Sequence, residues 1–244
     1  MGLIAIEKLA KVEPGATLAD LDKTALAHGL ATPLGINSTT GIAGLTLGGG
    51  FGWLTRKCGM TIDNLVSAQM VTADGRLNQL SPEQNSELFW AIRGGGGNFG
   101  VITRFEFALH PVAPDILAGL LVFPIDQADS VLPKYRDFVK SAPEEFNAWV
   151  ILRQAPPLPF LPAEVHGKKV IVLAVFHAGE ISAGQRSLEG LPMNALTLSR
   201  DGNTCVLSRR NFIRHTDCAW LRRLVFTCFA MVAFAANSIL CRLA

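Results

Sequence analysis

The stretch STTGIAGLTLGGGFG, residues 38–52, is the most distinctive part of the chain, and GGGGNFGV, residues 94–101, has the same character. Of 23 glycines, 15 lie between Gly29 and Gly100. Glycine clustered in this way marks backbone that turns sharply or approaches another group closely. Without side chains, such loops offer backbone N–H groups, which suit a pyrophosphate or the electron-rich edge of a reduced ring. Hydroxyl donors are added by Thr39, Thr40 and Thr46.

The second loop contains a familiar spacing in an unusual context. Gly95, Gly97 and Gly100 match GxGxxG, the dinucleotide fingerprint, which needs a strand before it and a helix after it. Here a predicted helix over 86–93 precedes the glycines and a predicted strand over 101–109 follows them, so a Rossmann site is not expected. Each loop could still be only a tight connection, but two such loops beside β structure favour a shared ligand.

Elements around the loops follow from local signals. Residues 3–12 alternate as a strand does, and Thr17 with Asp20 forms a capping box that predicts a helix over 17–28. We expect 65–72 to pair with 76–80 across Asp74-Gly75, a strong two-residue turn signal. A second helix is predicted over 84–93, stopped by Gly94.

A change of character near Pro111 and Pro114 predicts a domain boundary. Beyond it, strand and helix patterns alternate, which predicts a sheet covered by helices on one face. The expected class is α+β throughout, with one domain over 1–112, a second over 113–191, and an atypical tail over 192–244.

The tail differs in composition from what precedes it. No lysine follows Lys169, seven of the 14 arginines lie from Arg200 onward, and residues 224–241 are 18 uncharged residues. That length can span a bilayer. A tail-anchored membrane protein, a buried helix and a non-native tail are the alternatives, and the last is favoured because 199–220 lacks domain-like periodicity.

Composition excludes several classes. With 49% hydrophobic and 17% charged residues the chain is not disordered, and a net charge of +2 gives no case for nucleic acid. Five cysteines form no CxxC and no metal-ligand spacing with histidine, so no metal site is expected. The N-terminal residues do not resemble a signal peptide, which favours the cytoplasm.

Three stretches together carry a specific resemblance: VEPGATLADLD (12–22), the continuous segment from Ser38 to Arg76, and ELFWAIRGGGGNFGVITRFEF (87–107). They look like the FAD-binding oxidoreductases of the vanillyl-alcohol oxidase superfamily, closest to the berberine-bridge-enzyme-like branch. The resemblance is dense over 12–112 and weaker to residue 191. It implies an incomplete FAD-binding PCMH-type domain followed by the start of an antiparallel-sheet substrate domain.

The resemblance also implies which residues contact FAD and what the whole protein does. Asp63 and Asn64 would brace the first loop, although a cap or turn role is equally open for both. Hydride transfer from a small alcohol, sugar or amine to flavin N5 is implied, with molecular oxygen as the acceptor. The implied cofactor contacts are Ser38, Thr39, Thr40, Gly41, Gly44, Thr46, Leu47, Gly48, Gly49, Gly50, Asp63, Asn64, Asn98, Gly100 and Val101.

The chain departs from the family pattern at several points. The loop with the flavin-linking histidine is expected upstream of Met1, and the catalytic base downstream of residue 191, so the catalytic residue is unknown. Cys58 stands where relatives often have tyrosine and is interpreted as a packing residue. A truncated enzyme that is weakly active or inactive is therefore expected, and a fold remnant that binds no FAD is the alternative.

Bound FAD is predicted to be non-covalent. Some relatives link the flavin to a cysteine at the position of Asn37, whose amide is no nucleophile, and the first histidine, His28, lies in a predicted helix. Acid precipitation should therefore release all flavin into the supernatant. A yellow pellet after denaturation would contradict this prediction.

Overall fold

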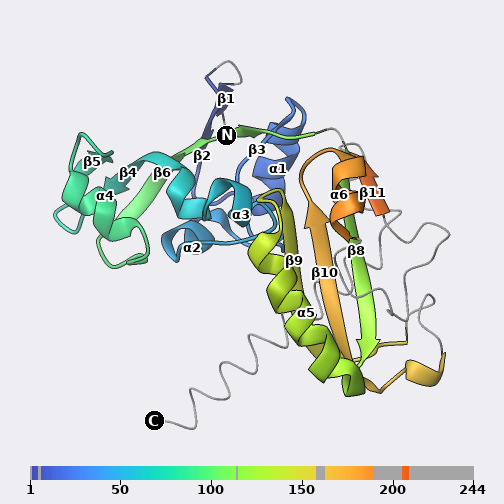
Figure 1. Ribbon diagram of the computed structural model, residues 1–244. Helices are drawn as coiled ribbons and strands as arrows, with labels where there is room; N and C mark the ends of the chain where they lie inside the picture. The colour runs from blue at the N-terminus through green and yellow to red at the C-terminus, as the bar shows by residue number, and fades with distance from the viewer. Residues whose placement is uncertain (1, 5–6, 114, 158–162, 189–204, 209–244) are drawn as a thin grey trace, which may run out of the picture. The chain divides into compact units, whose positions relative to one another are not determined.

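The computed structural model describes residues 2–4, 7–113, 115–157, 163–188 and 205–208 (Figure 1). Contacts between residues divide the chain into two compact units, with the division between residues 114 and 115. Both units combine antiparallel sheets with helices, so the expected α+β class is confirmed. That the first domain is the FAD-binding domain and the second the start of a substrate domain remains a prediction.

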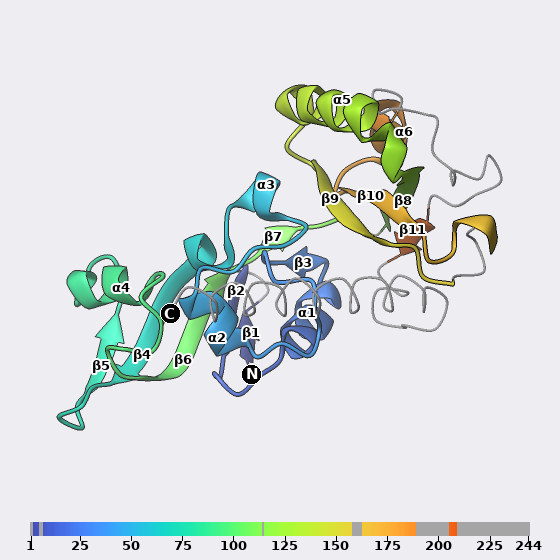
Figure 2. The same ribbon diagram turned by 90° about the horizontal axis from the view of Figure 1, so that it is seen from below.

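A five-stranded sheet forms the frame of the first unit, and every neighbouring pair in it is antiparallel (Figure 2). Ala68 lies opposite Phe105 on one side and opposite Leu80 on the other, which fixes the register of three strands. In spatial order the strands are β1 (Gly2–Ile4), β2 (Leu9–Val12), β6 (Val101–Ala108), β4 (Leu65–Val71) and β5 (Leu77–Leu80).

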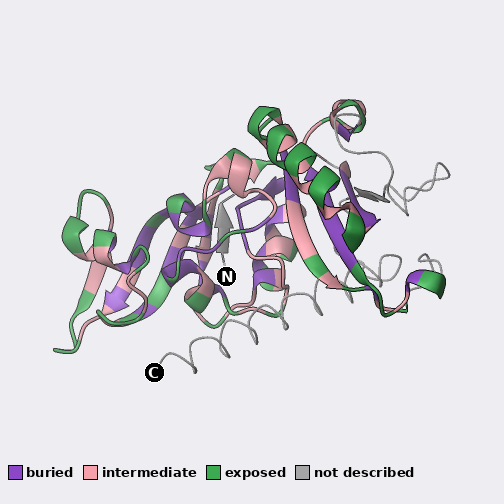
Figure 3. Cartoon of the chain, turned by 60° about the horizontal axis from the view of Figure 1, so that its bottom comes forward, coloured by how far each residue is buried: buried purple, intermediate pink, exposed green. Residues whose placement is uncertain are grey.

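One face of this sheet is the core of the unit (Figure 3). Phe105 and Phe107 lie two residues apart on the same face of β6. Both are fully buried, and their ring centroids lie 5.7 Å apart. Helices α1 (Leu18–Leu26) and α4 (Ser86–Ile92) contribute Leu21 and Phe89 to the same cluster. The period of two along β6 therefore separates a buried face from a polar face.

The capping box predicted at the start of α1 is confirmed. The Thr17 N–H donates to Asp20 Oδ2 at 2.8 Å, and the Asp20 N–H donates to Thr17 Oγ1 at 3.4 Å. The hydrogen bonds from Thr17 lower the pKa of Asp20 below its ordinary value. Gly29, with φ of 73°, ends the helical turn as its position predicts.

The predicted hairpin is also confirmed, with one correction to its turn. Val71 pairs with Leu77, and the Thr72 N–H donates to Arg76 O at 3.0 Å. The loop between that last pair has three residues, 73–75, rather than the predicted two. Gly75, with φ of 79°, supplies the left-handed residue that a three-residue loop requires.

The second unit is a four-stranded antiparallel sheet in the order β11 (Cys205–Ser208), β8 (Asp115–Pro124), β10 (Lys169–His177) and β9 (Phe146–Gln154). Helices α5 (Ala128–Ser141) and α6 (Ile181–Leu188) lie on one face, as predicted (Figure 2). Tyr135 of α5 donates its hydroxyl to Ala148 O at 2.7 Å. Two short 3-10 turns, η2 (Ile125–Gln127) and η3 (Ala163–Val165), complete this unit.

Four features differ from the sequence prediction. The single strand expected over 3–12 is two antiparallel strands, because Lys8 adopts a φ of 53° between them. The first glycine stretch contains a short helix, α2 (Ile42–Leu47), and is followed by α3 (Thr55–Cys58) and the 3-10 turn η1 (Thr61–Asn64). A two-residue pairing of β3 (Leu30–Ala31) with β7 (His110–Pro111) was not predicted. Strand β11 lies within the stretch predicted to be atypical.

No helix in the described part of the chain is long and apolar enough to cross a membrane. The uncharged stretch 224–241, which raised the membrane alternative, lies outside the described residues.

Candidate cofactor-binding site

The first glycine loop begins against helix α1. The Leu18 N–H donates to Thr40 O and the Ala19 N–H donates to Ser38 O, both at 3.0 Å. Thr39 turns back on Asn37, donating its N–H and its hydroxyl to Asn37 Oδ1 at 3.2 and 2.9 Å. The start of α1 therefore fixes the path of residues 38–40 through backbone bonds.

After α2 the chain reverses at two glycines. Gly49 and Gly50 have φ of 103° and 70°, values that residues with side chains rarely adopt. Their carbonyls accept the N–H groups of Ile62 and Thr61, respectively, both at 2.9 Å. A Cβ on Gly50 would overlap the Thr61 side chain, so the fold itself requires glycine there.

The turn that receives this reversal is held by Asp63 and Asn64. Asp63 Oδ2 accepts the Met60 N–H at 2.9 Å, and its other oxygen forms an ion pair with Arg93 Nη2 at 3.3 Å. Asn64 Nδ2 donates to Cys58 O and Met60 O, both at 2.8 Å. Both residues thus act as caps of the turn beside the loop, and their contact with a cofactor remains a prediction.

The second glycine loop lies beside the first. The Gly96 N–H donates to Leu47 O at 3.2 Å, which joins the loops directly. Asn98 Nδ2 donates to Gly95 O at 2.7 Å and closes the second loop on itself. Gly100 has a φ of 155°, and a Cβ there would collide with Val71 O, so this glycine serves the start of β6. The sequence prediction that both loops share one place is consistent with these contacts.

Other glycines have no such structural reason. Gly41 and Gly44 have φ outside the left-handed region, and a Cβ on either would meet no atom within 4 Å. Gly97 in the second loop is the same in both respects. Open space beside backbone that does not need glycine is what a closely approaching ligand requires.

The side chains of the remaining predicted contacts vary in access. Thr39 is exposed and Val101 is 70% exposed, whereas Leu47 and Thr46 are buried. The Thr46 hydroxyl has no hydrogen-bond partner among the described residues, and neither does the buried Thr61 hydroxyl next to Gly50. Both hydroxyls are fully buried beside the glycine reversal, so their lack of a partner does not by itself define a ligand contact.

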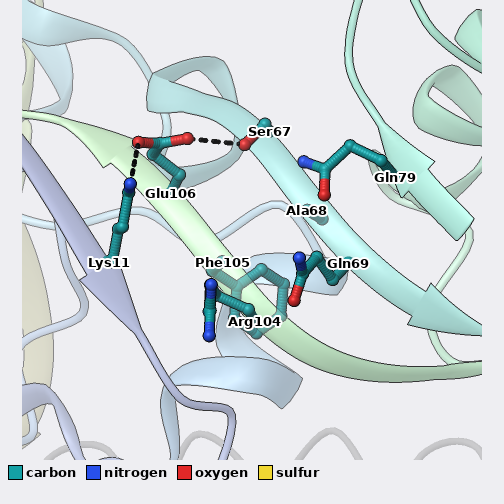
Figure 4. A pocket seen from close by; sticks show the side chains of 8 residues that line it. All are labelled: Lys11, Ser67, Ala68, Gln69, Gln79, Arg104, Phe105 and Glu106. Carbon is teal, nitrogen blue, oxygen red and sulfur yellow. Dashed lines mark hydrogen bonds and ion pairs between the residues drawn. The ribbon is translucent and has the colours of Figure 1, made fainter. Parts of the chain in front are cut away.

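A separate hollow of about 120 Å³ lies on the polar face of the first sheet (Figure 4). Glu106 lies between Lys11 and Ser67, with an ion pair of 3.8 Å to the lysine and a hydrogen bond of 2.8 Å from the serine. These contacts join β2, β6 and β4. The sequence predictions did not include this cluster. The signal that could have revealed it is the alternation of polar and apolar residues along β6. We assign the cluster to strand pairing.

Two joined glycine loops on an α+β domain define a backbone cradle of the kind used by proteins that bind dinucleotide cofactors. Residues 2–81 match the family described as FAD binding domain. The chain is 38% identical over 175 residues to an FAD-linked oxidoreductase of Dictyostelium discoideum, covering 71% of this chain and 36% of that protein. It is also 41% identical over 114 residues to (R)-6-hydroxynicotine oxidase of Paenarthrobacter nicotinovorans, covering 47% of this chain and 25% of that protein.

Solved structures agree with these relatives. The crystal structure of 6-hydroxy-D-nicotine oxidase from Arthrobacter nicotinovorans matches with a TM-score of 0.73 and 26% identity, covering 87% of this chain and 45% of that one. A berberine-bridge-enzyme-like protein of Physcomitrella patens has the same fold, with a TM-score of 0.71. The resemblance to the FAD-binding oxidoreductases is therefore confirmed, and the berberine-bridge-enzyme-like protein shares the fold. The chain spans less than half the length of these relatives.

The two kinds of glycine should respond oppositely to alanine. Gly50→Ala should lower the free energy of unfolding by about 3 kcal/mol, because a left-handed φ and an overlap with Thr61 are both unfavourable. Gly44→Ala should raise it by up to about 1 kcal/mol, because alanine favours the helix that glycine weakens. Urea unfolding followed by far-UV circular dichroism checks both, and equal effects would contradict the distinction.

Proposed function

We propose that the first unit forms one wall of an FAD site in an oxidoreductase. The observation that carries the proposal is the open space beside Gly41 and Gly44, where the fold does not require glycine. Two aromatic side chains in the loops are partly exposed, Phe51 at 52% and Phe99 at 39%. A bound ring system would cover such side chains. The match to an FAD binding domain family identifies the ligand class.

The described residues would bind and orient the cofactor rather than react with it. Backbone N–H groups of the two loops suit a pyrophosphate, although those of Thr39, Thr40 and residues 94–96 already donate within the protein. Gly49 and Gly50 hold the backbone reversal, while Asp63 and Asn64 keep the neighbouring turn in place. Bound FAD would supply hydride acceptance at N5, chemistry that protein side chains do not provide.

We also propose a small organic substrate and molecular oxygen as the acceptor. The names of relatives support this class: one is a 6-hydroxynicotine oxidase and another is a xylooligosaccharide oxidase. Because the chain spans only part of the length of these relatives, the choice among alcohol, sugar and amine stays open. A fold remnant without FAD is the alternative outcome of the tests below.

Gly44→Val should weaken FAD binding at least about tenfold, because its side chain occupies the space left open beside α2. Flavin fluorescence titration gives the affinity, and far-UV circular dichroism should show an unchanged fold. Gly15→Val is the matched control: its Cβ also meets nothing within 4 Å and its φ is not left-handed, but it lies outside both glycine loops. Unchanged FAD affinity in Gly44→Val would show that the loop is only a connection.

Gly49→Val, which the sequence alone suggests as a test, is the weaker choice. Its φ of 103° and the Met60 methyl group 2.8 Å from a Cβ mean that it would disturb the fold as well as the cofactor. A loss of flavin binding in Gly49→Val would come from backbone strain as well as from blocked space, whereas a loss in Gly44→Val would come from blocked space alone.

Oxidase activity has its own test. The chain with added FAD should consume oxygen and release hydrogen peroxide weakly or not at all over an alcohol, sugar and amine panel, and turnover well above free flavin would show that the catalytic group lies within these 244 residues. Gly44→Val at the same FAD concentration is the negative control. If the chain binds FAD and reduces an artificial dye but consumes no oxygen, the acceptor is a molecule other than oxygen.

A further inference from the structure

His110 makes a contact that neither the resemblance nor the motif explains. Its Nε2 lies 2.5 Å from Asn64 Oδ1, although the two residues are 46 positions apart. The backbone of His110 is fixed by the pairing of β7 with β3, where it lies opposite Ala31. The contact therefore joins the end of the first unit's chain to the turn beside the first glycine loop.

The direction of this hydrogen bond follows from the other contacts of Asn64. Its Nδ2 donates to two carbonyls, those of Cys58 and Met60, so rotating the amide would place an oxygen against both. Oδ1 must therefore face His110, and an amide oxygen only accepts. The donor is the Nε2–H of His110. Burial and the positive charges of Lys57 and Lys8 lower the pKa of His110 below its ordinary value.

We propose that His110 is a positioning residue for the FAD site, acting through Asn64 on the turn that holds Gly49 and Gly50. The effect on FAD rests on the proposed function, whereas the effect of His110 on the turn rests only on the contacts described above. Asn64 is 5% exposed, so in the folded chain its Oδ1 relies on the His110 donor rather than on water. The turn carries Thr61 and Ile62, whose N–H groups bind the Gly50 and Gly49 carbonyls.

The bond itself is tested without cofactor. A two-dimensional ¹H–¹⁵N spectrum of the histidine rings in the full chain should show His110 protonated at Nε2, with the signal assigned by its loss in His110→Gln. A bare Nε2 would overturn the proposal, because two acceptors would then face each other.

Hydrogen exchange tests the coupling to the loop, also without cofactor. His110→Ala should speed amide exchange at Thr61 and Ile62 by about tenfold, since the turn loses one of its anchors. His28→Ala, which removes an exposed histidine at the end of α1, should leave both rates unchanged. Equal rates in His110→Ala and the unaltered chain would overturn the proposal whether or not FAD binds.

FAD affinity completes the test. His110→Ala should bind FAD about tenfold more weakly, while His110→Gln, whose amide can donate to Asn64, should bind within about twofold of the unaltered chain. The double variant His110→Ala/Asn64→Ala should be no weaker than Asn64→Ala alone, because both act through one turn. If the unaltered chain binds no FAD, the proposed function fails while the exchange result still decides the role of His110. FAD affinity unchanged in His110→Ala would show that the turn does not position the site.

Discussion

The left-handed backbone at Gly49 and Gly50 is the constraint on which the first unit depends. It lets the chain reverse directly after α2, so that two carbonyls meet the N–H groups of Thr61 and Ile62. No other residue could make that reversal at comparable energy, because a side chain would be strained at such a φ and Thr61 leaves no room. The positions of α2, of the following turn and of β4 all follow from it.

The elements that were predicted correctly are those whose signals are local. Thr17 and Asp20 define the start of α1 within four residues, and Asp74-Gly75 marks the hairpin between β4 and β5. In the second unit, the alternation of strand and helix segments along the chain was enough to predict a sheet covered by helices on one face. Each of these depends on neighbours in sequence, where propensity and pattern act directly.

What could not be predicted depends on pairs that are distant in sequence or on backbone that side chains do not reveal. Lys8 at positive φ divides one expected strand into two, and nothing in its residue type indicates that. The contact between Asn64 and His110 requires the pairing of β3 with β7, two strands of two residues each. The cofactor contacts were assigned by resemblance, and the structure adds which of those glycines the fold itself requires.

That division among glycines also explains how a site with few charged groups is kept in order. The loops are joined by the bond from the Gly96 N–H to Leu47 O, and the nearby ion pair of Arg93 with Asp63 is partly exposed on both sides. An exposed pair of that kind contributes little, typically less than about 1 kcal/mol. Alignment of the loops therefore comes from backbone geometry, with Gly50 and Gly100 shaping the chain and Gly41 and Gly44 leaving it open. In the proposed FAD site, backbone contacts of this kind would need no charged side chains, whose reorganisation would reduce affinity.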